Sequence, residues 1–412
     1  MLDFKKFTLG NGLRVIYHED RSTPLVCMNI LYDVGARDED ASRTGFAHLF
    51  EHLMFGGSVN IPSYDEPLQR VGGENNAFTS NDITNYYLTV PTANLETAFW
   101  LESDRMLSLA FSEKSLEVQR NVVIEEFKQR YLNQPYGDIW LLMRPVVYKK
   151  HPYLWDTIGK EISHIAEAKM EDVKAFFRKF YSPNNAIMVL AGNVSLDEVK
   201  RLSEKWFGPI PKGTDNKRNL PVEPEQKEFR SLTVEREVPF NSIYKTYHMC
   251  SRKDKEFYAV DLLSDILSDG NSSRLYNELV KNKKMFSELN AYADDSMDKG
   301  MFVISGKVLD GFSMDAAEKA VEAELDKLKN EKVQEKELQK VQNKVEATLE
   351  FSEMNIMNKA LNFAIAELMG DANQVNKEAE KYLAVNNNEV QTQAKQIFRR
   401  ENCSTLYYLA KK

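Results

Sequence analysis

Two histidines with a glutamate between them are the residues of this sequence best suited to chemistry. They occur in Gly45-Phe-Ala-His48-Leu-Phe-Glu51-His52-Leu-Met-Phe-Gly56, which is bounded by glycines and otherwise compatible with a helix. On a helix, His48 and His52 lie one turn apart on one face, where two imidazoles can bind one metal ion. Glu51 lies beside that face, where a carboxylate can reach a water on the metal without binding the metal. The alternative is that both histidines are ordinary core or surface residues of an amphipathic helix.

A third metal ligand has to come from elsewhere in the chain, because a catalytic zinc has three protein ligands and one open position. The helix-like stretch Arg120-Asn-Val-Val-Ile-Glu125-Glu126-Phe127 offers two adjacent carboxylates. Spacing alone does not decide between Glu125 and Glu126, and either could belong to a solvated helix face.

Helices and strands must position these residues. The chain has 412 residues, and at about 150 residues per domain this length predicts two or three domains. A stretch rich in proline and charge, residues 211–228, predicts an exposed linker between domains at 1–210 and 229–412. Both parts begin with an alternating strand and end with a helix followed by an apolar strand, which indicates an internal duplication. Chance similarity is the alternative.

Local patterns predict an α+β protein with a mostly antiparallel sheet packed by helices in each half. Phe7–His18 predicts a hairpin around a Gly-Asn-Gly turn, and Pro24–Val34 and Ala77–Pro91 each predict a strand. Phe46–Met54 predicts a helix. Ala316–Tyr382 predicts a long helical region in the second half.

Composition excludes several classes of protein. The 54 basic and 62 acidic residues give a net charge of −8, which argues against a nucleic-acid binder. The longest strongly apolar run, Ala186–Ala191, is far shorter than the roughly 20 residues that cross a membrane. The first residues lack the apolar core of a secretion signal, and three scattered cysteines form no disulfide framework. We therefore expect no membrane partner and a cytoplasmic location.

The order of motifs resembles the pitrilysin-type zinc metallopeptidases, the inverted zincins with an HxxEH motif, which include the mitochondrial processing peptidase. HLFEH is followed by RNVVIEE, and Leu9–Val15 matches the opening hairpin of the family. Gly72–Ser80 matches the substrate-side edge strand, although an ordinary turn before a strand is the alternative there, and Gly270–Tyr276 matches the SRL segment. The resemblance implies half of a clamshell built from two homologous domains, as in small bacterial-type subunits.

The resemblance also implies roles for individual residues. It implies that His48, His52 and Glu126 bind one zinc per chain. Glu126 is chosen over Glu125 because the family's ligand is the last residue of RNxVxxE. Glu51 is the general base that activates the metal-bound water and then passes the proton to the leaving amine. The residues that begin the edge strand and pair with an extended peptide are Asn75, Asn76 and Ala77.

The sequence departs from the family at two places. Some members carry an acidic residue where this chain has Gln119. The family also uses an Arg and a Tyr seven residues apart to steady the oxyanion, and register places Val280 and Ser287 at those positions. The sequence therefore predicts a zinc endopeptidase subunit that works as a heterodimer with a homologue without a metal site, with a homodimer as runner-up. A presequence-processing peptidase and a structural subunit resembling respiratory-complex core proteins are the alternatives.

Overall fold

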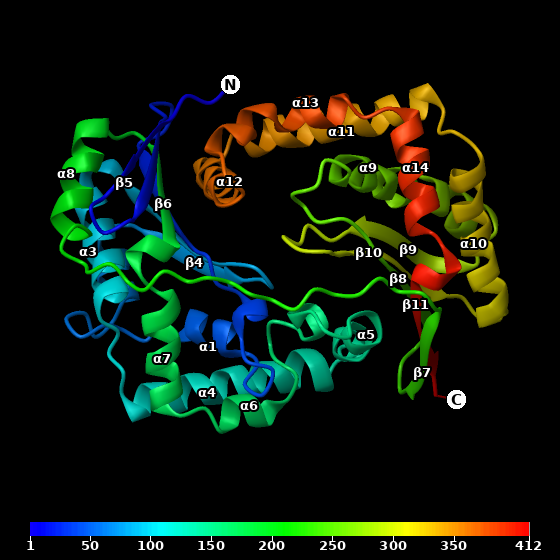
Figure 1. Ribbon diagram of the computed structural model, residues 1–412, viewed down its shortest axis with the longest axis horizontal. Helices are drawn as coiled ribbons and strands as arrows, with labels where there is room; N and C mark the ends of the chain where they lie inside the picture. The colour runs from blue at the N-terminus through cyan, green and yellow to red at the C-terminus, as the bar shows by residue number, and fades with distance from the viewer. Residues whose placement is uncertain (412) are drawn as a thin grey trace. The chain divides into compact units, whose positions relative to one another are not determined.

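The computed structural model describes residues 1–411, which form two compact units (Figure 1). The first unit contains Met1–Gln129, Trp155–Leu220 and Glu350–Lys377, and the second contains the rest of the described chain. The chain passes between the units at several points, and one of them, after Leu220, lies inside the predicted linker. Each unit also holds a segment from the other half of the sequence, since Arg130–Leu154 packs in the second unit and Glu350–Lys377 in the first.

The first unit is built on a six-stranded sheet with the order β1-β2-β6-β3-β5-β4. Neighbouring strands are antiparallel except β2 and β6, which are parallel. β4 forms one edge of the sheet, where its outer backbone groups face away from β5. The strands are β1 (Lys5–Thr8), β2 (Arg14–Glu19), β3 (Leu25–Tyr32), β4 (Glu74–Thr79), β5 (Thr84–Pro91) and β6 (Ala186–Gly192).

The predicted hairpin is present as β1 and β2, whereas the single strand predicted over Ala77–Pro91 is wrong. That stretch forms the end of β4, a turn and β5. Ser80 closes the turn: its backbone N–H donates to the Ile83 carbonyl at 2.8 Å, and its hydroxyl oxygen accepts from the N–H of Asp82 and Ile83. The alternating Thr and Tyr pattern hid this turn, which contains neither glycine nor proline.

Helices cover both faces of this sheet. α1 and α3 pack on the face of β4 and β5, and α7 packs on α1. α12 covers the opposite face, where the fully buried Phe363 belongs to the same apolar cluster as Ile16 and Ile187. The remaining helices of the unit lie around these. Their bounds are α1 (Phe46–Leu53), α2 (Asp65–Arg70), α3 (Leu95–Leu107), α4 (Glu113–Phe127), α6 (Ile162–Ala166), α7 (Met170–Phe180), α8 (Leu196–Trp206) and α12 (Ile356–Leu368).

The second unit has a five-stranded sheet with the order β7-β11-β8-β10-β9. Counted along the chain, this is the same order as β2-β6-β3-β5-β4. In each of these two sets of five strands, the strand that comes first in the sequence is parallel to the one that comes last. The shared topology is what the repeated sequence pattern predicts, and the predicted α+β fold class is confirmed. The strands are β7 (Arg230–Arg236), β8 (Asn241–His248), β9 (Phe286–Ala293), β10 (Met301–Val308) and β11 (Cys403–Ala410).

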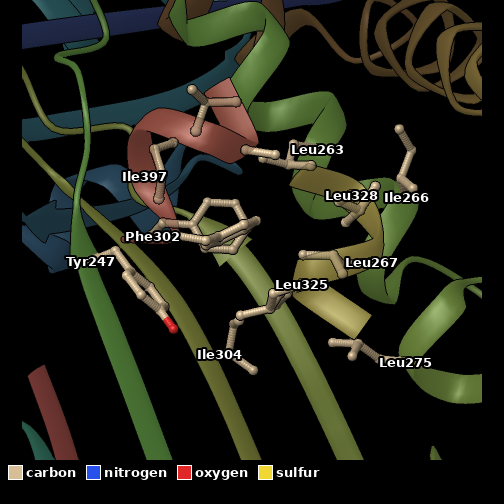
Figure 2. Close-up of a cluster of buried hydrophobic side chains, with 14 of the residues drawn as sticks. Tyr247, Leu263, Ile266, Leu267, Leu275, Phe302, Ile304, Leu325, Leu328 and Ile397 are labelled. Atoms are coloured by element: carbon tan, nitrogen blue, oxygen red, sulfur yellow. The ribbon is translucent and has the colours of Figure 1, made fainter. Parts of the chain in front are cut away.

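Helices again pack on both faces of the second sheet. Figure 2 shows one core, in which Leu263 and Leu267 of α9 meet Phe302 of β10 and Leu325 of α10. On the other face, α5 packs against β7 and β11. The helices are α5 (Ile139–Val147), α9 (Phe257–Ser268), α10 (Met314–Asn330), α11 (Glu335–Ser352), α13 (Glu378–Leu383) and α14 (Asn387–Ile397).

The end of the predicted linker is not exposed throughout, which corrects the sequence interpretation. Glu223 and Gln226 are buried. The Glu223 carboxylate accepts the backbone N–H groups of residues 149–151 at 2.8–2.9 Å. Gln226 donates to the Cys403 carbonyl of β11 at 2.8 Å. Polar composition predicted exposure, but these side chains are buried because backbone groups satisfy them.

Candidate metal centre

Helix α1 is held at its start by a buried carboxylate. Both oxygens of Glu39 accept backbone N–H groups, one from Gly45 and one from Ala47, each at 2.8 Å. Burial raises the pKa of Glu39 to about 8, against the lowering effect of these two donors. Gly45 has a φ of 89°, and a side chain there would meet the Ile158 carbonyl. Glycine is therefore required where the helix begins.

The orientation of α1 follows from its apolar face. Leu49 and Phe50 are fully buried, and the Phe50 ring stacks on Tyr181 with centroids 5.0 Å apart. His48 and His52 lie on the other side of the helix and are half-buried. Both imidazoles consequently point away from the core, towards α4.

Helix α4 brings the third side chain. The Ser112 hydroxyl caps it by accepting the N–H of Ser115, and the buried Val123 and Phe127 face inward. α4 packs directly on α1 (Figure 1). Glu126, next to Phe127, therefore faces the two histidines of α1.

Three potential ligand atoms converge between these helices. The Nε2 atoms of His48 and His52 are 3.3 Å apart, and the Oε2 atom of Glu126 lies 3.7 Å from the first and 3.4 Å from the second. Atoms about 2.0–2.1 Å from a tetrahedral zinc stand about 3.3–3.4 Å from one another. The site thus has the spacing and the donor set, two imidazoles and one carboxylate, of a catalytic zinc centre. Within residues 1–411 it is the one group of this kind.

The two candidate carboxylates point in different directions. Glu125 is exposed, and its Oε1 atom accepts from Lys128 Nζ at 2.6 Å. Glu126 is the one that reaches the histidines. The helical period explains the difference, because adjacent residues are turned by about 100° around the axis.

Glu51 is held from the neighbouring edge strand. Its Oε2 atom accepts a hydrogen bond from the Thr79 hydroxyl at 2.6 Å. Thr79 ends β4 and was not singled out from the sequence. It stands two residues after Ala77, so the strand period places both side chains on the same face. That spacing is the signal that could have identified Thr79.

The three predicted peptide-contacting residues lie in β4. Asn75 donates to Asp65 at 2.8 Å, and the Ala77 N–H donates to the side-chain oxygen of Asn76, also at 2.8 Å. The Ala77 N–H therefore faces the open edge rather than β5. A side-chain oxygen occupies the place that a peptide carbonyl would take in an added strand.

A buried arginine of α3 packs against β5, the strand next to β4, and the sequence analysis did not identify it. Arg105 is 2% exposed and makes two hydrogen bonds to Glu102, at 2.9 and 2.7 Å. Its guanidinium lies 4.6 Å from the ring centre of Tyr64 and 4.5 Å from that of Tyr86. Burial raises the pKa of Tyr86, and the nearby charge of Glu51 adds to this. The cation–π contact with Tyr86 holds α3 against β5, and the ion pair with Glu102 within α3 keeps the guanidinium in place.

The positions at which the sequence departs from its family lie in different units. Gln119 is half-buried on α4, two turns before Glu126. Val280 packs against the second unit's core from the π-helical turn Tyr276–Asn282. Ser287 is exposed on β9.

No helix within residues 1–411 is long and apolar enough to cross a membrane.

Comparison with known proteins defines the class to which this fold and site belong. Residues 14–136 match the family described as Insulinase (Peptidase family M16), and residues 168–345 match its Peptidase M16 inactive domain. The chain belongs to peptidase family M16, which confirms the pitrilysin-type resemblance.

Individual proteins of known name or structure are similar to this chain. The chain is 33% identical to the zinc protease PqqE of Helicobacter pylori over 81% of this chain and 76% of the relative. A crystal structure of a protease from Helicobacter pylori superposes with a TM-score of 0.93 at 28% identity, covering 99% of this chain and all of the other. The periplasmic protease PqqL of Escherichia coli shares the fold, with a TM-score of 0.81 at 19% identity. It is matched over 99% of this chain but only 48% of its own length.

Proposed function

We propose that this chain is a zinc-dependent endopeptidase subunit that hydrolyses peptides or unfolded segments. The observation that carries the proposal is the convergence of the His48 and His52 imidazoles and the Glu126 carboxylate at separations of 3.3–3.7 Å. The names of relatives such as the zinc protease PqqE support the same metal and reaction.

The chemistry is divided between the metal and the residues around it. Bound zinc lowers the pKa of water towards about 7 and polarises a carbonyl. Glu51 accepts a proton from the attacking water while the new C–O bond forms at the scissile carbon. Glu51 then delivers this proton to the amide nitrogen, and the C–N bond breaks to release an amine and a carboxylate.

The edge strand β4 offers a place for the substrate. A peptide that adds to β4 as a further strand pairs with Asn75, Asn76 and Ala77 through backbone groups, and this pairing ignores side-chain identity. Such pairing requires an extended chain with free backbone groups. Peptides and unfolded segments meet this requirement, whereas the paired strands of a folded protein do not.

A second subunit completes the proposed enzyme. Val280 has no hydrogen-bond donor in its side chain and Ser287 is short, so neither replaces the Arg and Tyr of the family. PqqL, of which this chain matches about half, supports the view that two such halves work together. The proposed partner is a homologous chain without a metal site that supplies the Arg and Tyr, and a second copy of this chain is the runner-up.

The test of the proposed function is a comparison of Glu51→Gln with wild type. Glutamine keeps the size of the side chain but cannot accept the proton. Zinc content should stay at about one per chain, while peptide hydrolysis falls by roughly 10² or more, the usual scale of general-base catalysis. Glu125→Gln, on the exposed side of α4, is the matched control. Undiminished hydrolysis by Glu51→Gln contradicts the proposed mechanism.

A further inference from the structure

We propose that Thr79 is a positioning residue, whose hydroxyl holds the carboxylate of Glu51 in its working orientation. This inference rests on the proposed function, in which Glu51 is the general base. The observation behind it is the 2.6 Å hydrogen bond from Thr79 Oγ1 to Glu51 Oε2. A hydrogen bond from a hydroxyl to a carboxylate is charge-assisted and belongs to the stronger kind.

The donor sits on a rigid part of the fold. Thr79 is the last residue of β4 and pairs in register with Thr84 of β5. The turn that follows is fixed by the hydrogen bond from Ser80 N–H to the Ile83 carbonyl and by one from Ala36 N–H to the Ser80 carbonyl, at 2.8 and 3.1 Å. Threonine is also β-branched, so its own side-chain torsion is restricted. The hydroxyl is therefore held in place before any substrate arrives.

The acceptor needs such a restraint. A glutamate side chain has three rotatable bonds, and general-base catalysis requires its oxygen to lie within about 3 Å of the proton that it takes. One hydrogen bond to Oε2 removes much of this freedom. A carboxylate has about four lone-pair positions, so it can accept from Thr79 and still receive a proton.

The same strand also offers its edge to the peptide. Ala77 and Thr79 stand two residues apart, so their backbone groups point to the same side of β4. The Ala77 N–H faces the open edge. A peptide paired at Ala77 is thereby placed relative to the strand that holds the base. Loss of the Thr79 hydroxyl should leave this pairing intact and disturb only the base, so it should change kcat rather than KM.

The experiment compares Thr79→Val, which keeps the branched shape without the hydroxyl, with Thr79→Ser, which keeps the hydroxyl. Zinc-loaded protein with its partner subunit is assayed on an unstructured peptide. We expect kcat of Thr79→Val to fall about ten- to a hundredfold, the scale of one hydrogen bond to a charged group, with KM and zinc content unchanged. Thr79→Ser should restore most of kcat.

Two further measurements separate a positioning role from a structural one. Adding Thr79→Val to Glu51→Gln should cause no additional loss, because the group that Thr79 positions no longer acts as a base. Thr92→Val is the control, since its hydroxyl also donates one hydrogen bond, at 2.9 Å, but to the Pro24 carbonyl. Thermal unfolding of each variant verifies that it is folded, and Thr79→Ala replaces Thr79→Val if the latter does not fold.

The inference is overturned if Thr79→Val keeps wild-type kcat, if Thr79→Ser is as slow as Thr79→Val, or if the double variant is slower than Glu51→Gln alone. Failure of the proposed function looks different, because then Glu51→Gln itself hydrolyses peptide at the wild-type rate. A large loss in Glu51→Gln with none in Thr79→Val rejects the role of Thr79 alone.

Discussion

The Nε2 atoms of His48 and His52 and the Oε2 atom of Glu126 are brought together by the packing of α1 on α4. All three side chains are only 13–24% exposed. Two imidazoles and one carboxylate at separations of 3.3–3.7 Å match the donor set of a zinc site. The proposed zinc would therefore bind with little rearrangement of these three side chains.

The first prediction concerns these ligands. His48→Ala, His52→Ala and Glu126→Ala should each weaken zinc binding by roughly 10²-fold or more, since even outer-shell partners of a metal contribute about 10- to 100-fold. Zinc bound per chain, measured by elemental analysis after dialysis, checks this. Glu125→Ala should keep its zinc, because Glu125 points to Lys128. Zinc loss in Glu125→Ala instead of Glu126→Ala contradicts the assignment.

The second prediction concerns a single titrating carboxyl in α9. Burial, with the charges of Asp261 and Asp269 one turn away on either side, raises the pKa of Asp265 from about 3.8 to about 7. Below about pH 4 this carboxyl is protonated in both the folded and the unfolded protein, and its contribution to the free energy of unfolding is fully present. That contribution is lost as pH rises through about 7. Asparagine does not titrate. Asp265→Asn should therefore gain stability over wild type as pH rises from 5 to 8, by on the order of 1 kcal/mol.

Urea unfolding midpoints at several pH values measure this difference. Asp315→Asn, on the exposed start of α10, is the control and should show no such trend. A difference between Asp265→Asn and wild type that is the same at pH 5 and pH 8 contradicts the assignment of the shift to Asp265.

At the scale of elements, α1 depends on a residue outside itself. The α1 sequence has no serine, threonine or aspartate at its N-terminus, and the Glu39 carboxylate takes the place of such a cap from six and eight residues away. Because a helix start leaves N–H groups without partners, this contact holds the start of the helix that carries His48 and His52.

The third prediction follows from that contact. Glu39→Ala should destabilise the protein by about 1–2 kcal/mol, the usual cost of losing a helix cap, and weaken zinc binding because α1 is less firmly held. Thermal unfolding and zinc titration measure the two effects. Glu161→Ala is the matched control, since Glu161 stands at the start of α6 without capping it. Unchanged zinc affinity in Glu39→Ala would show that α1 holds its place without this cap.

Local patterns sufficed for the elements that carry chemistry. The hairpin, α1 and the edge position of β4 followed from turn residues, from helical spacing and from the family motif. The break between β4 and β5 did not, because Ser80 closes that turn by hydrogen bonds that composition does not reveal. The hydrogen bond from Thr79 to Glu51 joins a strand to a helix 28 residues away, and such a contact is visible only in three dimensions.

At the scale of the whole molecule, the two units are interwoven along the chain. The predicted helical region 316–382 is divided between the two units: its middle part, which contains α12, covers the first sheet, and the rest belongs to the second unit. The reason lies in β6, where all seven residues are buried. A strand that is apolar on both sides needs covering on both faces, and the helical residues of the cluster around Ile16 and Ile187 come from α12 and the short helix after it.

The fourth prediction is that residues 1–220 do not fold as an independent domain. This fragment lacks α12 and exposes the apolar face on which Phe363 packs. It should aggregate or unfold without a cooperative transition, as measured by circular dichroism and thermal melting. In the full chain, Phe363→Ala should cost about 3–5 kcal/mol for the same reason. A fragment that melts cooperatively at the temperature of the full chain contradicts this account.

The fifth prediction concerns the assembled enzyme and tests the central claim most directly. The measurement is the cleavage rate of an unstructured peptide by this chain alone, by its equimolar mixture with a homologue that carries the Arg and Tyr, and by the mixture after zinc removal. The isolated chain should be about 10²–10³-fold slower than the mixture, because an oxyanion donor is missing. Chelation should abolish the activity, and one equivalent of zinc should restore it. Cleavage that survives complete removal of zinc would contradict the account, and an isolated chain as fast as the mixture would reject the need for a second, different subunit.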